Sequence, residues 1–324
     1  MSLRKAAECV RKKSSFVITT HTSAEGDALG SELALYNLLK KLGKQAVIIN
    51  DDALLLEYAF LPGVKKIKRF NSALKAVKFD CLALVDCSDI SRCGSVSAMN
   101  TGRQTVLNID HHISNTYFAD ANWVDPHASS ASEMVYRLFK YMRISLDKET
   151  AKLLYVGILT DTGSFHYSNT TSTTHRIAAG LLNYGLDVAR IYKESYSNVP
   201  FDQMQVLGKA LSEIRRDSRG KVVWLCLNND PALLPKSFDL SEHLLSLMRS
   251  IKGVEVAILF REGLRKKGEV RVNLRSEGGV DVNKVAAYFS GGGHRTASGC
   301  TIEGRLNEVA KKVLRKIKEG ISCR

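Results

Sequence analysis

The sequence contains no apolar run that approaches the roughly 18 residues of a membrane-spanning helix. The segment after Met1 is polar and includes Arg11-Lys12-Lys13, so it also lacks the apolar centre of a secretory leader. The seven cysteines are odd in number and scattered, and no two form a C-x-x-C pair. We therefore expect a cytoplasmic protein with reduced thiols and no membrane contact, without a disulfide framework or a cysteine zinc site.

Internal repeats and low-complexity segments are also absent, which excludes solenoid and fibrous architectures. At 324 residues the chain is long enough for two domains with separate cores. The sequence predicts a first domain over residues 1–185, a helical linker over 186–205 and a second domain over 206–324.

The net charge is +14, because 47 Lys and Arg residues outnumber 33 Asp and Glu residues. The basic residues are spread along the chain, as in Lys65-Lys66 and Arg215-Arg216, and do not form one tail. Two interpretations remain open at this point: solvated basic faces, or a polyanionic ligand held by Lys and Arg. Charge alone does not separate nucleic acid from small nucleotides.

In the first domain, apolar runs alternate with helical patterns. The expected strands are 16–20, 45–50, 81–86 and 105–110, and the expected helices are 28–42, 130–142 and 148–159. Buried runs separated by helices predict an α/β domain built on a parallel sheet with helices on both faces. The second domain is expected to be a smaller α/β domain with a smaller sheet, formed by strands 221–227, 254–260 and 269–274 and helices 282–289 and 305–317.

Acidic and imidazole side chains follow the apolar segments of the first domain. In a parallel sheet these positions gather at the carboxyl ends of the strands, where ligands bind. Six of them are candidate metal ligands: His21, Glu25, Asp27, Asp86, His111 and Asp161. Carboxylate and imidazole without thiolate suit Mn²⁺, Mg²⁺ or Fe²⁺, and six ligands suit two ions about 4 Å apart that share a bridging carboxylate. Any one of these residues could instead cap a helix or end a strand, but four converging clusters favour metal-assisted hydrolysis of a phosphoester.

These clusters resemble the motifs of the DHH phosphoesterase family, which takes its name from the triplet Asp110-His111-His112. The segment 21–31, HTSAEGDALGS, is similar to the first motif of the family. Val85-Asp86 resembles the second motif, and the segment 157–165, GILTDTGSF, resembles the fourth. The resemblance extends over the whole chain.

The resemblance implies a role for each ligand. His21, Glu25 and Asp86 would hold one ion, and Asp27, Asp86, His111 and Asp161 the other, with Asp86 as the bridge. Asp110 would orient an imidazole, with His111 as the residue it supports, and His112 would face the reacting phosphate. Glu25 departs from the family pattern, which more often has Asp at this position. The implied cofactors are two divalent ions, Mn²⁺ first, with Mg²⁺ and Co²⁺ as alternatives.

A glycine-rich segment, Ser290-Gly291-Gly292-Gly293-His294-Arg295, is the main feature of the second domain. Glycine N–H groups can approach a phosphate closely, and His294 and Arg295 add donors and charge. A flexible turn is the other interpretation. The segment resembles the DHHA1 domain, which argues against the pyrophosphatase branch of the family. The expected substrate-binding residues are Arg275, Ser276, Gly291, Gly292, Gly293, His294 and Arg295.

The size and two-domain layout resemble the family members that degrade very short oligoribonucleotides, such as pApA and pGpG, to 5′-mononucleotides. Such members also dephosphorylate 3′-phosphoadenosine 5′-phosphate (pAp). Short RNA and nucleotides are therefore the expected partners, and long duplexes are not. Two alternatives remain: a cyclic-dinucleotide phosphodiesterase, and a non-catalytic nucleotide- or RNA-binding protein. The sequence leaves open whether the chain forms a homodimer.

Overall fold

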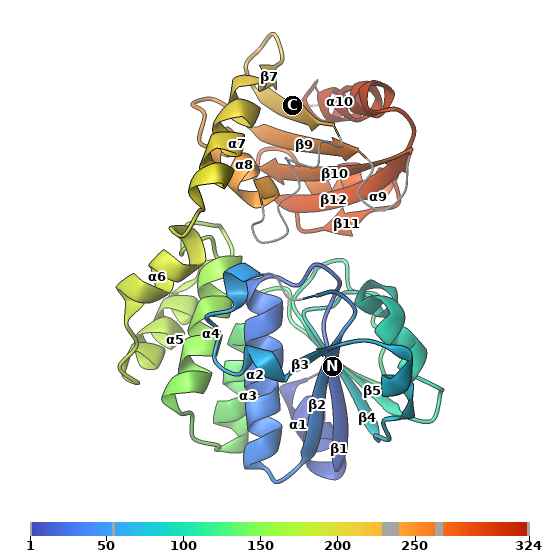
Figure 1. Ribbon diagram of the computed structural model, residues 1–324, viewed down its shortest axis with the longest axis vertical. Coiled ribbons are helices and arrows are strands. Elements are labelled where there is room, and N and C mark those ends of the chain that lie inside the picture. Colours follow the sequence, from blue (N-terminus) through green and yellow to red (C-terminus); the bar gives the residue numbers. More distant parts are fainter. Residues whose placement is uncertain (1, 54–55, 229–239, 263–267, 323–324) are drawn as a thin grey trace. The chain divides into compact units, whose positions relative to one another are not determined.

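The computed structural model describes residues 2–53, 56–228, 240–262 and 268–322. The chain divides into two compact units, Met1–Asn198 and Val199–Arg324. Each unit contains its own sheet and its own hydrophobic cores (Figure 1). The two units are described separately below.

Unit 1 is built on a six-stranded sheet of order β3-β2-β1-β4-β5-β6, in which every neighbouring pair is parallel. Its strands are β1 (Ser15–Thr19), β2 (Gln45–Asn50), β3 (Ile67–Arg69), β4 (Cys81–Val85), β5 (Thr105–Asp110) and β6 (Ala121–Val124). The central strand β4 is buried along its whole length, which explains why it appears in the sequence as an uninterrupted apolar run. The predicted parallel sheet is confirmed, and the short edge strands β3 and β6 add to it.

The α-helices of unit 1 gather on one face of this sheet (Figure 1). They are α1 (Leu3–Lys12), α2 (Gly26–Lys41), α3 (Ala131–Met142), α4 (Lys148–Asp161), α5 (Ser172–Leu182) and α6 (Val188–Tyr196). Helices α1, α2 and α3 contact strands, α4 packs on α2 and α3, and α5 and α6 pack outside α4.

The opposite face of the sheet is covered by loops and 3₁₀ helices, chiefly η3 (Ser72–Ala76) and η4 (Ile90–Met99). Cys93, Val96 and Met99 of η4 belong to the core on this face. Both faces are therefore covered as expected, but within the described residues only one of them carries α-helices.

Unit 2 contains a second six-stranded sheet, of order β11-β12-β10-β9-β8-β7. Its strands are β7 (Arg215–Arg216), β8 (Val222–Leu227), β9 (Val256–Glu262), β10 (Glu269–Ser276), β11 (Gly292–Gly293) and β12 (Ala297–Glu303). The pair β8–β9 is parallel and the other pairs are antiparallel. The expectation of a smaller sheet was wrong, because the short strands β7 and β11 and the glycine-containing strand β12 lack an apolar run.

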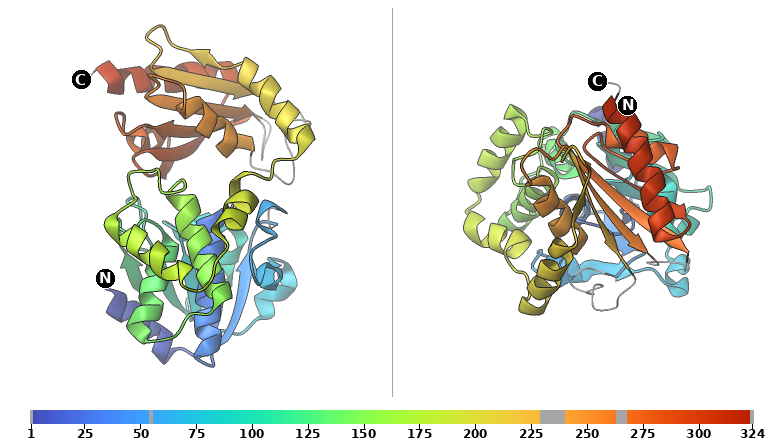
Figure 2. Two further views of the ribbon diagram at one scale, coloured as in Figure 1. Left: turned by 90° about the vertical axis from the view of Figure 1, so that its left-hand side faces the viewer. Right: turned by 90° about the horizontal axis from the view of Figure 1, so that it is seen from above.

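Helices cover both faces of the second sheet. They are α7 (Phe201–Ser212), α8 (Leu240–Arg249), α9 (Val282–Tyr288) and α10 (Leu306–Ser322). Helices α9 and α10 share one core with the sheet, whereas α7 and α8 share the other. Seen from above, α10 in red and α8 in orange lie on opposite sides of the strands (Figure 2).

The border between the units, at Asn198–Val199, lies inside the range 186–205 that the sequence predicts as a linker. This range is not one helix: α6 ends at Tyr196 and α7 begins at Phe201. The extended backbone of Pro200 (ψ 148°) separates them, as expected for a residue before the first helical turn. The exact domain boundaries stay a prediction.

Among the described residues, no helix is both long enough and apolar enough to cross a membrane. The six described cysteines form no disulfide, and the seventh, Cys323, lies outside the described residues.

Candidate metal centre

The predicted polar clusters meet at the carboxyl ends of β1 and β4. These strands are neighbours, but the chain continues from β1 to β2 on one side and from β4 to β5 on the other. Such a change of direction opens a crevice beyond the strand ends. His21 follows β1 by two residues and Asp86 directly follows β4, so both side chains are delivered to this crevice. Their Nε2 and Oδ2 atoms lie 3.5 Å apart.

Two further carboxylates come from the ends of helices. Asp27 lies in the first turn of α2 and Asp161 is the last residue of α4. Glycine lets these helices pack closely. A Cβ at Gly30 would lie 2.6 Å from the Leu153 carbonyl oxygen, and a Cβ at Gly157 would overlap Ser132. Glycine at positions 30 and 157 therefore brings both helix ends to the site.

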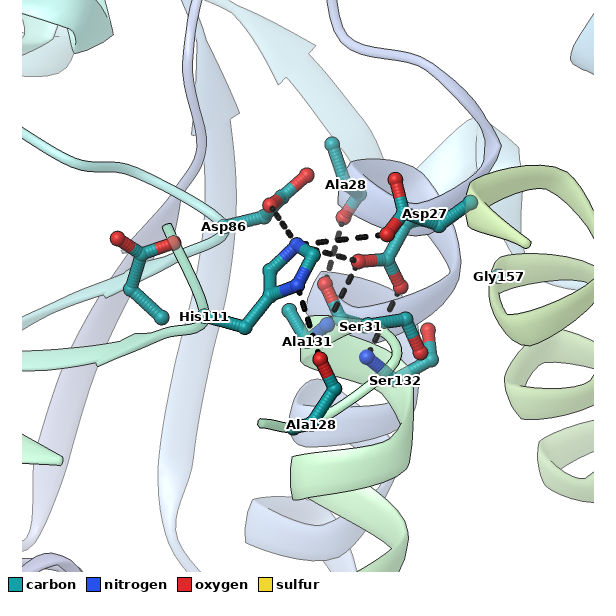
Figure 3. A network of polar contacts seen from close by, with 12 residues as sticks. Asp27, Ala28, Ser31, Asp86, His111, Ala128, Ala131, Ser132 and Gly157 are labelled. Carbon is teal, nitrogen blue, oxygen red and sulfur yellow. Dashed lines mark hydrogen bonds and ion pairs between the residues drawn. The ribbon is translucent and has the colours of Figure 1, made fainter. Parts of the chain in front are cut away.

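His111 is the centre of the cluster (Figure 3). Its Nε2 atom lies 3.4 Å from Asp86 Oδ1, 3.5 Å from Asp161 Oδ2 and 3.9 Å from Asp27 Oδ2. The other ring nitrogen, Nδ1, lies 3.3 Å from the Ala128 carbonyl oxygen, which fixes the orientation of the ring. Three carboxylates from three different elements thus surround one imidazole nitrogen.

The carboxylate of Asp27 is bound by the N-terminus of α3. The backbone N–H of Ala131 donates to Oδ2 at 2.7 Å, and that of Ser132 donates to Oδ1 at 2.9 Å. A helix N-terminus stabilises an anion through exposed N–H groups and its dipole. The Ser130 side chain accepts from the Glu133 N–H as the N-cap of α3, which fixes the start of this helix beside Asp27.

Burial and mutual repulsion perturb the carboxyl groups strongly. Burial, and then the negative charge of Asp86, raises the pKa of Asp27 to about 7. Burial also raises the pKa of Asp161 well above its usual range, although His111 opposes the shift. For Asp86 the contacts with His111 and His21 outweigh the opposing effect of burial and hold the pKa well below its usual range.

The surrounding carboxylates favour the charged form of His111. Burial lowers the pKa of His111, but the charges of Asp161 and Asp86 outweigh burial and raise the pKa well above its usual range. Burial and the neighbouring negative charges thus oppose ionisation of Asp27 and Asp161. A divalent cation held by these carboxylates would offset both effects, which is the linkage expected of a metal site.

Three donor groups lie close enough together to bind one cation. The ligand atoms of Asp27, Asp86 and His111 all lie within 4.8 Å of one another, and all three residues are buried. Asp86 Oδ1 is buried and accepts no hydrogen bond from the described residues. Oxygen and imidazole nitrogen donors without sulfur suit a divalent ion of the Mg²⁺ or Mn²⁺ type.

The remaining predicted ligands lie at the edge of this group. His21 is partly buried, and its Nδ1 is 2.7 Å from the Thr22 carbonyl oxygen, so Nε2 faces Asp86. Glu25 occupies the N-cap position of α2 and is exposed. Its negative charge contributes to the raised pKa of Asp161, after the larger effects of burial, His111, Asp27 and Asp86.

Within the triplet Asp110-His111-His112, Asp110 contacts a different imidazole from the one expected. Asp110 Oδ1 is 2.7 Å from Nδ1 of His112, not of His111, whose Nδ1 is held by a backbone carbonyl. The reason is geometric, because Asp110 is the last residue of β5 and lies beside His112 after the chain turns. Asp110 therefore orients His112.

Two asparagines that the sequence interpretation missed support these carboxylates. Asn115 Nδ2 donates to Asp110 Oδ2 at 2.6 Å. Asn169 Nδ2 lies 3.4 Å from Asp161 Oδ2 and donates to the Asp161 carbonyl oxygen at 3.0 Å. Neither asparagine has a sequence signal of its own, because both contacts depend on how the chain turns after β5 and α4.

In unit 2, the predicted phosphate-binding Arg275 is held by an acidic side chain. Its Nη2 atom lies 2.6 Å from Glu242 Oε2, and Nε lies 3.3 Å from Glu242 Oε1. Ser276 is buried, and its hydroxyl donates to the Val280 carbonyl oxygen at 2.7 Å. Ser276 thus shapes the turn after β10, and Arg275 has an internal counter-charge.

The glycine segment forms a β-hairpin, not an open loop. Gly292 pairs with Gly299 and Gly293 with Ser298. Gly291 donates its N–H to the Ala286 carbonyl oxygen at 2.8 Å, and a Cβ there would overlap the Gly299 carbonyl. The expectation that all three glycine N–H groups are open to a phosphate is therefore wrong for Gly291, where glycine allows close approach to β12.

The turn of this hairpin carries the two predicted polar side chains, His294 and Arg295. The His294 N–H donates to the Ala297 carbonyl oxygen at 2.7 Å, which closes the turn. Arg295 is exposed, with Nη2 3.3 Å from the Gly278 carbonyl oxygen.

Comparison with known proteins adds an independent finding. The DHH family N-terminal domain matches residues 15–158, and the DHHA1 domain matches residues 237–321. The bifunctional oligoribonuclease and PAP phosphatase NrnA of Thermus thermophilus is 33% identical over 94% of this chain and 90% of its own length. The chain belongs to the DHH–DHHA1 family of phosphoesterases. The predicted family is confirmed.

Other similar proteins also cover most of the chain. A probable bifunctional oligoribonuclease and PAP phosphatase NrnA of Streptococcus mutans is 29% identical and covers 90% of each chain. The crystal structure of an exopolyphosphatase-related protein from Bacteroides fragilis superposes with a TM-score of 0.86 at 28% identity, covering 98% of this chain and 95% of that one. Both domains of the family are therefore present in one chain.

Proposed function

We propose that this DHH–DHHA1 protein uses two divalent ions, Mn²⁺ first, to hydrolyse short oligoribonucleotides such as pApA and pGpG to 5′-mononucleotides. We also propose that it removes the 3′-phosphate of pAp. The observation that carries the proposal is the buried group Asp27, Asp86 and His111, whose ligand atoms lie within 4.8 Å of one another. The relatives named as oligoribonuclease and PAP phosphatase support the choice of substrate.

The proposed ligand sets follow the two sides of Asp86. His21, Glu25 and Asp86 would hold one ion, and Asp27, Asp86, His111 and Asp161 the other. Asp86 would be a ligand of both ions, a role supported by its two carboxylate oxygens, which face different imidazoles, Oδ2 toward His21 and Oδ1 toward His111. When bound, such ions polarise the phosphoryl oxygens and activate water for in-line attack.

Asp110 and His112 would supply the proton that the leaving oxygen takes up. Asp110 accepts from Nδ1 of His112, so the proton that this ring exchanges with substrate is the one on Nε2. The His112 ring, oriented by Asp110, would donate its Nε2 proton to the leaving oxygen as a general acid. Asn115, through its bond to Asp110, holds this pair in place.

Unit 2 is proposed to bind substrate phosphate. Arg275, His294 and Arg295 supply positive charge and donors for phosphate, and Gly292 and Gly293 let the substrate approach the hairpin closely. Ser276 and Gly291 shape the backbone of this region. Substrate phosphate would compete with Glu242 for the guanidinium of Arg275.

The experiment is a substrate panel with metal analysis. Purified protein with Mn²⁺ is given pApA, pAp, cyclic di-AMP and a longer RNA, and products are separated by chromatography. We expect AMP from pApA and pAp, and about two Mn²⁺ per chain by elemental analysis. Asp161→Ala should lower kcat/KM for pApA by at least about 100-fold, since even indirect supports of a metal site cost up to that much.

Glu149→Ala is the matched control, because Glu149 is exposed at the other end of the same helix, α4. It should retain full activity and metal content. A metal-loaded protein that releases no AMP from pApA or pAp would contradict the proposal. Turnover of cyclic di-AMP alone would identify a cyclic-dinucleotide phosphodiesterase instead, and a protein that binds nucleotide but no metal would be a non-catalytic binding protein.

A further inference from the structure

Arg92 is connected to both sides of the candidate metal centre. It lies in η4, six residues after Asp86, and its Nη1 atom donates to Ser88 Oγ at 3.2 Å. Ser88 is buried two residues after Asp86. The carbonyl oxygen of Arg92 accepts from the Thr22 N–H at 2.7 Å, directly after His21. Its backbone and its side chain are therefore tied to the two segments that carry His21 and Asp86.

No carboxylate lies within 4.0 Å of the Arg92 guanidinium among the described residues, although the side chain is half-buried. Arg137, by contrast, pairs with Asp125 at 2.7 Å. A guanidinium has five N–H donors, and the bond to Ser88 uses one of them. A hydrogen bond to a neutral hydroxyl does not require a charged side chain, whereas a doubly donated contact to phosphate oxygens does.

We propose that Arg92 binds the non-bridging oxygens of the phosphoryl group that is hydrolysed, and that Ser88 aims its guanidinium at them. This inference rests on the proposed phosphoesterase function and adds a substrate contact within unit 1. The positive charge is placed where negative charge develops during attack, which favours the transition state over the bound substrate.

Three variants separate this role from a structural one. Arg92→Gln removes the charge, and Arg92→Lys keeps a point charge without the paired N–H donors of a guanidinium. Ser88→Ala removes the hydrogen bond between the Ser88 hydroxyl and the guanidinium. Arg103→Gln is the control, because Arg103 is exposed in the same unit. Each protein is assayed for kcat and KM on pApA, for Mn²⁺ content, and for binding of inorganic phosphate to the Mn²⁺-loaded protein by calorimetry.

We expect Arg92→Gln to lose about 10²-fold in kcat/KM, the usual effect of removing one donor to developing charge, with unchanged Mn²⁺ content. Its affinity for inorganic phosphate should fall by about tenfold or more, and Arg92→Lys should recover part of both losses. Ser88→Ala should lose less than Arg92→Gln, and Arg103→Gln should match the wild type.

Two outcomes would overturn the role of Arg92. One is wild-type phosphate affinity in Arg92→Gln, and the other is a loss in Ser88→Ala that equals the loss in Arg92→Gln, since the bond to Ser88 would then be the whole contribution. Failure of the proposed function is distinguishable, because it appears as an inactive wild type. Phosphate binding then decides the role of Arg92 by itself.

Discussion

Asn115 anchors the polar side chains that follow β5. Its amide nitrogen donates to Asp110 Oδ2 at 2.6 Å and to Asn108 Oδ1 at 2.8 Å. Its oxygen accepts from the Tyr117 N–H at 2.7 Å, which fixes the amide orientation. Asp110 is fully buried, and so the bond to Asn115 satisfies an oxygen that water does not reach. Asn115 therefore holds Asp110 in place, and Asp110 in turn positions the His112 imidazole.

Asn115→Ala should lower kcat on pApA by roughly 10- to 100-fold without lowering the Mn²⁺ content. The reason is that Asn115 supports His112 through Asp110 and contacts no proposed metal ligand. Stopped assays at saturating substrate and elemental analysis of the same preparation measure the two quantities. Asn183→Ala is the control, since Asn183 is exposed at the end of α5. An Asn115→Ala protein with normal kcat would show that Asp110 holds His112 unaided.

At the scale of elements, the site depends on how closely α2, α3 and α4 approach one another. Gly157 in α4 faces the first turn of α3, where a Cβ would overlap Ser132 Oγ and lie 2.8 Å from Asp27 Oδ1. The same contact region holds Asp27 against the N-terminus of α3. A single methyl group at this position would thus push a proposed ligand out of place.

Gly157→Ala should reduce the free energy of unfolding by about 1–3 kcal/mol, the usual cost of overpacking a core, and should also weaken Mn²⁺ binding. Urea denaturation and metal titration measure both effects. Gly208→Ala is the matched control in helix α7, because a Cβ there meets no atom within 4 Å. That substitution should stabilise the protein by about 0.4–1 kcal/mol. Equal behaviour of the two variants would show that the helices can separate freely.

Helix α2 also carries a buried glutamate that the proposed mechanism does not use. Glu32 is fully buried, and Asn50 Nδ2 donates to its Oε1 at 2.9 Å. Burial raises the pKa of Glu32 to about 8, against the opposing effect of Asn50. The folded protein therefore keeps this carboxyl group protonated at neutral pH, whereas the unfolded chain ionises it near pH 4.5.

Stability should consequently fall as the pH rises from about 4.5 to about 8, because the folded state binds the proton and the unfolded state does not. The contribution is at most about 1.4 kcal/mol per pH unit, and it levels off above pH 8. Glu32→Gln should remove it, so that the variant gains stability relative to wild type across this range in urea titrations. The exposed Glu149→Gln should show a constant difference. A constant difference for Glu32→Gln would contradict the raised pKa.

At the scale of the whole molecule, the proposed ligands all belong to unit 1, whereas the glycine hairpin and Arg275 belong to unit 2. Each unit has its own cores, so each can respond to its own ligand. Metal binding and phosphate binding should therefore be separable in the intact chain.

Hydrogen exchange with and without Mn²⁺ tests this division. Mn²⁺ should slow exchange in unit 1, around the start of α2 and the residues that follow β4 and β5, because binding stabilises the folded state only where ligands are held. Strands β8, β9 and β10 of unit 2 should be unaffected. The Asp86→Asn variant, measured in parallel, should lose the protection. Protection centred on unit 2 would contradict the proposed ligand set.

Much of the fold and the main chemistry could be predicted from the sequence alone. Strands β2 and β5 coincide with the predicted ranges, because apolar residues predominate in the strands of a covered parallel sheet. Parallel strands end at one edge of the sheet, so Asp86 and His111 could be expected to meet there. The family resemblance followed from the same residues.

Only the tertiary structure decided which side chains pair within the site. That Asp110 holds His112 and not His111 depends on how the chain turns after β5. The pairing of Arg275 with Glu242 joins residues 33 positions apart, and no spacing in the sequence indicates it. Arg92 reaches the site because η4 crosses back beside His21. Periodicity records which residues are buried, but the partner of a buried polar group depends on distances between segments that only folding brings together.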